Sequence, residues 1–101
     1  MSIAVKGVAI VTGAAQGIGR AIALRLAKDG FNVSLNDIHT NEDKLKHVAN
    51  EISSGRVKAI STVGDVSKEK DVSNLVNKTV EELGELNVVR SVLYTTSLTL
   101  T

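Results

Sequence analysis

Val8-Ala-Ile-Val-Thr-Gly-Ala-Ala-Gln-Gly-Ile-Gly-Arg20 is the stretch that decides how this chain folds. Its first four residues are apolar and mostly β-branched, which is typical of a strand buried on both faces of a parallel sheet. Three glycines follow, and from Ile18 onward apolar residues recur at helical spacing. The stretch therefore predicts a strand, a tight turn and a helix N-terminus. The backbone N–H groups and the dipole of such a helix end suit a phosphate or pyrophosphate.

Length and composition limit the kinds of protein to which this turn can belong. The chain has 101 residues, of which 43% are hydrophobic and 23% charged, as expected of one small globular domain. A net charge of +1 with interspersed signs gives no reason to expect nucleic acid or a membrane surface as a partner. Without cysteines there is no disulfide framework or thiolate site. No signal peptide or membrane-spanning stretch is recognisable, so we expect a cytoplasmic protein.

Strand-like and helix-like segments alternate along the rest of the chain. The boundaries predicted from capping residues, glycines and hydrophobic spacing are a helix from Ile18 to Lys28, a strand Phe31–Asp37, a helix capped by Asn41 and ending near Ser53, a strand Val57–Val63, a helix capped by Ser67 and ending at Gly84, and a fourth strand beginning at Leu86–Val89. The order βαβαβαβ predicts an α/β, Rossmann-like, three-layer fold with a parallel sheet and right-handed crossovers. With the strand order 3-2-1-4, a ligand belongs at the carboxyl ends of strands 1 and 4, where the glycine turn lies.

The third predicted helix carries two further expectations. The charged residues Lys68–Asp71 are interpreted as a solvated first turn. The apolar face that should meet the sheet consists of Val72, Leu75, Val76, Val80 and Leu83.

The spacing of the glycines separates three classes of ligand. A nucleoside triphosphate P-loop needs GxxxxGK[ST], and Ile18 and Gly19 stand where its glycine and lysine should be. A general GxGxxG pattern fails because Ala15 replaces the second glycine. The pattern present is TGxxxGIG, from Thr12 to Gly19, and it resembles the short-chain dehydrogenase/reductase family. Of its glycines, we expect Gly13 to permit the turn, Gly17 to allow close approach of the cofactor and Gly19 to allow close helix packing.

Two acidic residues support the resemblance. Asp37 ends the second strand about 20 residues after the turn, where a carboxylate accepts the adenosine-ribose hydroxyls and repels a 2′-phosphate. Since neither Ala14 nor Ala15 supplies a cation, NAD is favoured over NADP. Asp65-Val66 after the third strand is similar to the family's pair beside the adenine ring. Alternatively, Asp37 is a turn residue and Asp65 a helix-entry cap.

The residues expected to bind the cofactor are Gly13, Gln16, Gly17, Ile18, Gly19, Asp37, Ile38, Asp65 and Val66. His39, two residues after Asp37, is interpreted as a solvated loop residue, although it comes close enough in sequence to reach a ribose or phosphate. His47 is expected on the surface, and two separated histidines do not indicate a metal site.

The resemblance covers residues 7 to about 89, the first half of such an enzyme, with some similarity to the acetoin/diacetyl reductase branch at Gly30-Phe31, Asp37 and residues 83–89. From Arg90 onward the family's Asn-Asn-Ala-Gly motif is missing. The family reaction also needs a tyrosine with a lysine four residues later and a serine that orients the carbonyl. The only tyrosine here is Tyr94, followed four residues later by Leu98, so no catalytic residue is assigned.

Residues 90–101 differ in character from the rest of the chain. They contain one charge and many β-branched residues, which predicts an edge strand or an extension of the fourth strand. We therefore divide the chain into a dinucleotide-binding domain, 1–89, and a divergent β-prone tail, 90–101. The hypothesis at this stage is a truncated or frame-altered product in which the tail replaces the normal continuation.

Three functions follow as hypotheses. The first is the NAD-binding half of an oxidoreductase that transfers hydride to or from a small alcohol or carbonyl, inactive alone. The second is a non-catalytic or regulatory NAD-binding module, acting as a homo-oligomer or with a full-length relative. The third is a methyltransferase-like domain, whose GxG pattern occurs only as Gly17-Ile-Gly19, late in the turn.

Overall fold

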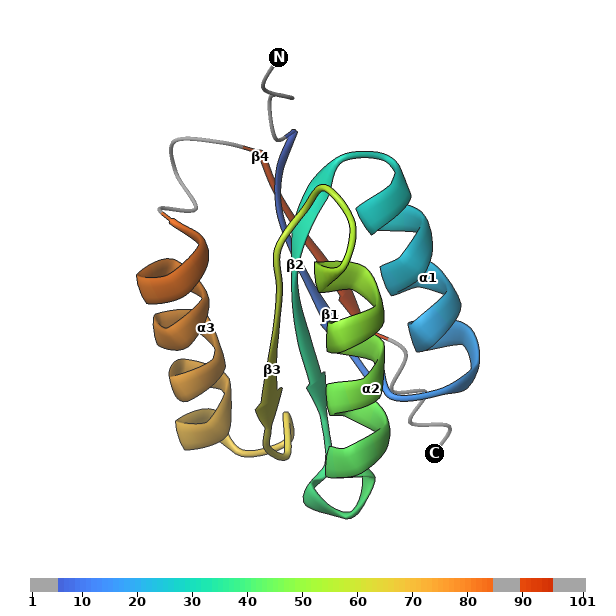
Figure 1. The fold of residues 1–101 in the computed structure, drawn as a ribbon. Helices are drawn as coiled ribbons and strands as arrows, with labels where there is room; N and C mark the ends of the chain where they lie inside the picture. The colour runs from blue at the N-terminus through green and yellow to red at the C-terminus, as the bar shows by residue number, and fades with distance from the viewer. Residues whose placement is uncertain (1–5, 85–89, 96–101) are drawn as a thin grey trace.

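The computed structural model describes residues 6–84 and 90–95, in which one parallel sheet lies between two layers of helices (Figure 1). The sheet has the order β3-β2-β1-β4, with α1 and α2 on one face and α3 on the other. This is the Rossmann-like α/β architecture predicted from the sequence. The elements in chain order are β1 (Gly7–Thr12), α1 (Gly17–Lys28), β2 (Phe31–Asp37), the 3-10 turn η1 (His39–Asn41), α2 (Glu42–Ser53), β3 (Ala59–Val63), α3 (Glu69–Leu83) and β4 (Arg90–Thr95).

The central strand β1 fixes the register of the sheet. Every residue of β1 is buried, as its apolar sequence predicts. Gly7 pairs with Phe31 of β2 and with Arg90 of β4, and the three strands then run in parallel to their carboxyl ends. The predicted start of the fourth strand at residues 86–89 lies outside the described residues. The strand itself occupies Arg90–Thr95, within the segment predicted to extend it or to form an edge.

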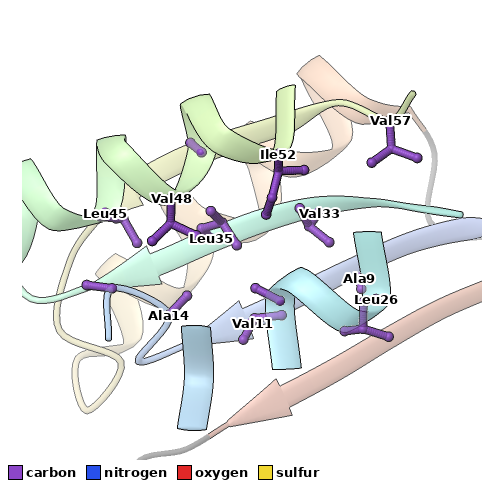
Figure 2. Close-up of a cluster of buried hydrophobic side chains, with 13 residues drawn as sticks. Ala9, Val11, Ala14, Leu26, Val33, Leu35, Leu45, Val48, Ile52 and Val57 are labelled. Atoms are coloured by element: carbon purple, nitrogen blue, oxygen red, sulfur yellow. The ribbon is translucent and has the colours of Figure 1, made fainter. Parts of the chain in front are cut away.

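The main hydrophobic core lies between the sheet and the α1–α2 layer (Figure 2). Successive side chains along a strand point to opposite faces of the sheet, so every second residue of β1 and β2 points into this core. The fully buried members include Val11, Val33, Leu35 and Leu45. Because this packing fixes both helices against β1 and β2, it also fixes the loops at the carboxyl ends of those strands.

The opposite face of the sheet is packed differently from the prediction. Of the five apolar residues expected on the inner face of α3, only Leu75 is buried, and Val72 is 37% exposed. The other fully buried residue of α3 is Thr79. It meets Ser34 of β2, whose hydroxyl lies 2.6 Å from Thr79 Oγ1. Because the sheet presents a hydroxyl here, a polar partner on the helix stabilises the contact better than a valine or leucine.

The direction of this buried hydrogen bond follows from its neighbours. Thr79 Oγ1 donates its single proton to the Leu75 carbonyl oxygen, 2.6 Å away. The hydroxyl of Ser34 is therefore the donor toward Thr79. This relay connects β2 to α3 through two side chains that both lack exposure to water.

The outer edge of the sheet is protected along β3, which begins at Ala59 rather than at the predicted Val57. The Lys58 carbonyl oxygen, just before β3, points toward β2 and accepts the Val33 N–H. Because carbonyl directions alternate along a strand, the carbonyls of Ala59 and Ser61 point away from β2. Two outward carbonyls receive side-chain donors instead: Ser53 Oγ lies 3.2 Å from Ala59 O, and Lys78 Nζ lies 2.9 Å from Ser61 O. Such donors reduce pairing of this edge with another strand.

Replacing Thr79 by valine tests the relay between β2 and α3. We expect Thr79→Val to lower the free energy of unfolding by about 1–3 kcal/mol, because the buried Ser34 hydroxyl loses its acceptor. The double variant Ser34→Ala with Thr79→Val should recover part of that loss. Urea unfolding monitored by circular dichroism measures both, with the exposed Ser73→Ala as the control. Strictly additive effects of the two changes would contradict the relay.

Candidate functional site

The glycine turn between β1 and α1 is fastened to the end of β2. Gly13 has a φ of +68°, a conformation that favours glycine. Ala14 N–H donates to the Asn36 carbonyl oxygen at 3.0 Å, and Ala15 N–H donates to Asp37 Oδ2 at 3.0 Å. The turn therefore continues the β1–β2 ladder beyond the last strand residue.

The second and third glycines have different physical roles. A Cβ atom on Gly19 would overlap the carbonyl oxygen of Gly13 and would come 3.2 Å from Ala14 Cα, so the first turn of α1 packs directly on the glycine turn. This confirms the packing role predicted for Gly19. A Cβ on Gly17 would meet no protein atom within 4 Å, although its φ of +60° favours glycine. The surface above Gly17 is thus open to an approaching ligand.

The N-terminus of α1 offers donors at this open surface. Gln16 occupies the N-cap position in extended conformation, and its side chain does not cap the helix. Gly17, Ile18 and Gly19 form the first turn, whose N–H groups have no acceptors within an α-helix. The Ile18 side chain is 69% exposed beside them. Backbone donors at the positive end of the helix dipole favour an anion such as a phosphate.

The Asp37 carboxylate is the most heavily bonded group of the site. It is only 9% exposed. Besides Ala15 N–H on Oδ2, it accepts Ile38 N–H at 2.8 Å and Asn41 Nδ2 at 3.0 Å, both on Oδ1. A carboxylate offers about four lone-pair positions, so three are occupied and Oδ2 retains room for another donor. Asn41 occupies the predicted N-cap position of α2, but its side chain does not cap the helix, because its amide donates to Asp37 instead.

A cleft of about 470 Å³ opens beside Asp37, between the carboxyl ends of β2 and β3. Ile38 and His39 line it from the β2 side, and Asp65 lines it from the β3 side. His39 is exposed, in accord with its interpretation as a loop residue, and it also borders the cleft. Val66 is partly buried and does not line the cleft. The remaining lining residues are Thr40, Val63, Gly64, Lys68 and Asp71.

The loop after β3 is ordered by hydrogen bonds from two directions. Gly64 N–H donates to the Asp37 carbonyl oxygen at 3.0 Å, which joins the end of β3 to the end of β2. Asp65 Oδ1 accepts the Ser67 hydroxyl at 2.6 Å and the Ser67 N–H at 2.9 Å. These bonds lower the pKa of Asp65 below its usual 3.8, so the carboxylate is ionised at neutral pH. Ser67 therefore does not cap α3 as predicted, and Lys68 occupies the N-cap position.

Asp71 is a site residue that sequence reasoning missed. It was interpreted as part of a solvated turn, yet its Oδ2 accepts the Asp65 N–H at 2.8 Å. The Cβ that Gly64 lacks would come 3.2 Å from Asp71 Cβ, so the loop passes directly over this side chain. One sequence signal was available, because an acid at the third position of a helix often reaches back to an N–H before it.

The structure thus brings most of the predicted residues to one edge of the sheet. Gly13 to Gly19 follow β1, Asp37 ends β2 and is followed by Ile38, and Asp65 follows β3. Hydrogen bonds connect the first group to the second and the second to the third. The edge combines the N-terminus of α1, a carboxylate with free acceptor capacity and a cleft. Within the described residues, no helix is long and apolar enough to cross a membrane.

Comparison with known proteins places these features in a family context. A family model of the short chain dehydrogenases matches residues 7–92. The short-chain dehydrogenase/reductase eriH of Hericium erinaceus is 52% identical over 86 residues, which are 83% of this chain and 34% of that protein. An (S)-acetoin-forming diacetyl reductase of Staphylococcus epidermidis is 46% identical over 81 residues, 80% of this chain and 31% of the reductase.

Solved structures give the same result at the level of the fold. A short-chain dehydrogenase/reductase from Burkholderia phymatum in complex with NAD has a TM-score of 0.70 and 30% identity, covering 76% of this chain and 27% of that one. An alcohol dehydrogenase from Thermococcus sibiricus complexed with 5-hydroxy-NADP also has a TM-score of 0.70, with 36% identity over 78% of this chain and 33% of that one. The chain thus spans about a third of the length of the relatives it matches.

Alanine substitutions of Gly17 and Gly19 should separate conformational strain from overlap. Gly17→Ala places a side chain in open space at positive φ, and we expect a loss of about 1–2 kcal/mol in stability. Gly19→Ala forces α1 away from the Gly13 carbonyl and should lower stability further, by more than about 2 kcal/mol. Thermal unfolding measures both. Equal losses would contradict the close packing of α1 on the glycine turn.

Removal of the Asp71 carboxylate tests the order of the loop after β3. We expect amide hydrogen exchange at Asp65 N–H to accelerate at least tenfold in Asp71→Ala, because this N–H loses its acceptor. In Asp71→Asn the side-chain oxygen remains as an acceptor, and exchange should stay within about threefold of the unaltered chain. Glu69→Ala, two residues earlier on the same turn, is the control. Unchanged exchange in Asp71→Ala would show that the bond does not hold the loop.

Proposed function

This chain belongs to the short-chain dehydrogenase family, and from that premise we propose that it binds NAD at the carboxyl ends of β1, β2 and β3, as the cofactor-binding part of an oxidoreductase. The observation that carries the proposal is the Asp37 carboxylate, which contacts the glycine turn and keeps acceptor capacity on Oδ2. The family membership supports a nicotinamide dinucleotide as the ligand.

The pyrophosphate is assigned to the N-terminus of α1. The N–H groups of Gly17, Ile18 and Gly19 point away from the helix body, and the helix dipole favours negative charge there. The open space above Gly17 supports this assignment, because a phosphate needs close approach to the backbone. Gly13 contributes to this site by permitting the turn, and Gln16 by its place at the N-cap of α1.

The adenosine half is assigned to Asp37 and the cleft next to it. Oδ2 of Asp37 accepts a ribose hydroxyl, and the negative charge of the carboxylate opposes a phosphate at the 2′ position. The cleft lined by Ile38 and Asp65 is the place for the adenine ring, with Val66 next to it in sequence. A carboxylate at the ribose is the reason for proposing NAD rather than NADP as the preferred cofactor.

The reaction is proposed from the family and its relatives. Bound nicotinamide supplies a hydride acceptor or donor, and a small alcohol or carbonyl compound is the proposed substrate class. Among the 101 residues the single tyrosine, Tyr94, has Leu98 rather than lysine four positions later. We therefore propose that these residues provide cofactor binding without the acid–base group of the reaction. A non-catalytic NAD-binding module is the alternative.

Titration calorimetry with NADH, NADPH and S-adenosylmethionine tests the proposed ligand, and Asp37→Asn tests the residue that selects it. We expect NADH to bind more tightly than NADPH and S-adenosylmethionine not to bind. In Asp37→Asn the side-chain oxygen remains but the charge is lost. The dissociation constant for NADPH divided by that for NADH should then fall about tenfold, equivalent to about 1.4 kcal/mol.

The control for this measurement is Asp29→Asn, which removes the same charge at the far end of α1, where Asp29 pairs with Arg25. The ratio of the dissociation constants for NADPH and NADH should not change in that variant. Tighter binding of S-adenosylmethionine than of NADH would overturn the proposal. Turnover of diacetyl or acetoin by this chain above the level of contaminants would contradict the claim that it binds without catalysing and would also exclude the non-catalytic alternative.

A further inference from the structure

The two edges of the sheet are protected to different degrees. β3 and β4 form these edges, because the strand order is β3-β2-β1-β4. Along β3, Ser53 Oγ and Lys78 Nζ donate to two outward carbonyl oxygens, at 3.2 and 2.9 Å. β4 is paired with β1 on one side, from Arg90 to Thr95, and its other side is the outer edge of the described sheet. Another strand is therefore expected to join at β4 more readily than at β3.

The helices pack mainly on the other three strands. α1 contacts β1 and β2, and both α2 and α3 contact β2 and β3. In the described part of the chain, β4 has its main contacts with β1. A strand at the edge of a sheet directs every second backbone N–H and C=O group away from its neighbour. In β4, these are the groups to which a further strand would bind.

The sequence of β4 lacks two features that commonly prevent such pairing. Natural edge strands are often blocked by proline or by a charge within the strand. The residues of β4 are Arg-Ser-Val-Leu-Tyr-Thr, with the single charge at the first position and no proline. Valine, tyrosine and threonine are enriched in strands because they pack well on a pleated surface. The sequence is thus suited to a strand contact between chains.

The position of the single charge favours a second copy of this chain in antiparallel orientation. A two-fold axis perpendicular to the sheet would pair the middle of β4 with itself and place the two Arg90 residues at opposite ends, about 20 Å apart. That separation exceeds two Debye lengths of about 8 Å, so the two charges would be screened from each other. Parallel pairing in register would instead place Arg90 directly beside Arg90, which is destabilising.

We propose that β4 is a self-association surface, at which two copies of this chain pair antiparallel and join their four-stranded sheets into one. Only one edge of each copy is used, and the β3 edges that remain outermost carry side-chain donors. The assembly therefore closes as a dimer and does not grow into a filament. An interface built on one strand of six residues is small, so the dimer is weak and depends on concentration. This surface is independent of the proposed cofactor site at the carboxyl ends of β1, β2 and β3.

Sedimentation equilibrium of the unaltered chain tests the stoichiometry. Between about 10 and 500 µM, we expect the mean mass to rise from the monomer value of 10.7 kDa toward twice that value, with no larger species. Leu93→Lys brings like charges together at the middle of the paired strands and should raise the dissociation constant at least about tenfold. Ser73→Lys adds the same charge at an exposed position of α3 and should change it less than about twofold. Circular dichroism checks the fold of each variant.

Amide hydrogen exchange of the unaltered chain locates the interface without any substitution, and so decides the matter even if Leu93→Lys fails to fold. We expect the outward N–H groups of β4 to exchange at least about threefold more slowly at the highest concentration than at the lowest, while exchange at Ile60 of β3 stays unchanged. A monomer at every concentration, a species larger than a dimer, or protection at Ile60 instead of β4 would overturn the proposal. A folded Leu93→Lys chain that dimerises as the unaltered chain does would overturn it as well.

Discussion

The hydrogen bond from Ala15 N–H to Asp37 Oδ2 is the interaction on which the arrangement of the site depends. It joins the glycine turn to the end of β2 through a side chain that is almost completely buried. From the same residue, the backbone carbonyl accepts Gly64 N–H and so holds the loop after β3. One residue thereby fixes three loops relative to one another. A buried carboxylate without these donors would be costly, so the turn and the carboxylate stabilise each other.

Asp37 can serve as a turn residue and as a ligand acceptor at the same time. From the sequence, a turn residue and a ribose acceptor were alternatives for this position. In the structure the carboxylate makes the local bonds of a turn residue, to Ile38 and Asn41, and still has room for a ligand on Oδ2. The two roles are compatible, because a carboxylate accepts more than two hydrogen bonds. A rigidly held carboxylate is also better suited to discriminate between cofactors, since it does not have to be ordered when a ligand binds.

Local features of the chain were predictable, and features that depend on partners far along the chain were not. The bounds of β2 agree with the prediction at both ends, because alternation and a terminal acid are local signals. The packing of Gly19 follows from its spacing to Gly13. In contrast, the burial of Thr79 depends on its hydrogen bond to Ser34, which lies 45 residues away in the chain. Hydrophobic periodicity therefore identified α3 correctly but misjudged its inner face.

If the carboxyl ends of β1, β2 and β3 form one dinucleotide site, a titration of the ¹⁵N-labelled chain with NADH should show it residue by residue. Amide chemical shifts report the contacted backbone residue by residue. We expect the largest changes at Gly17–Gly19, at Ile38 and at Asp65. Changes concentrated instead on the exposed face of α1, around Ala21 and Arg25, with no change at Ile38 and Asp65, would contradict it.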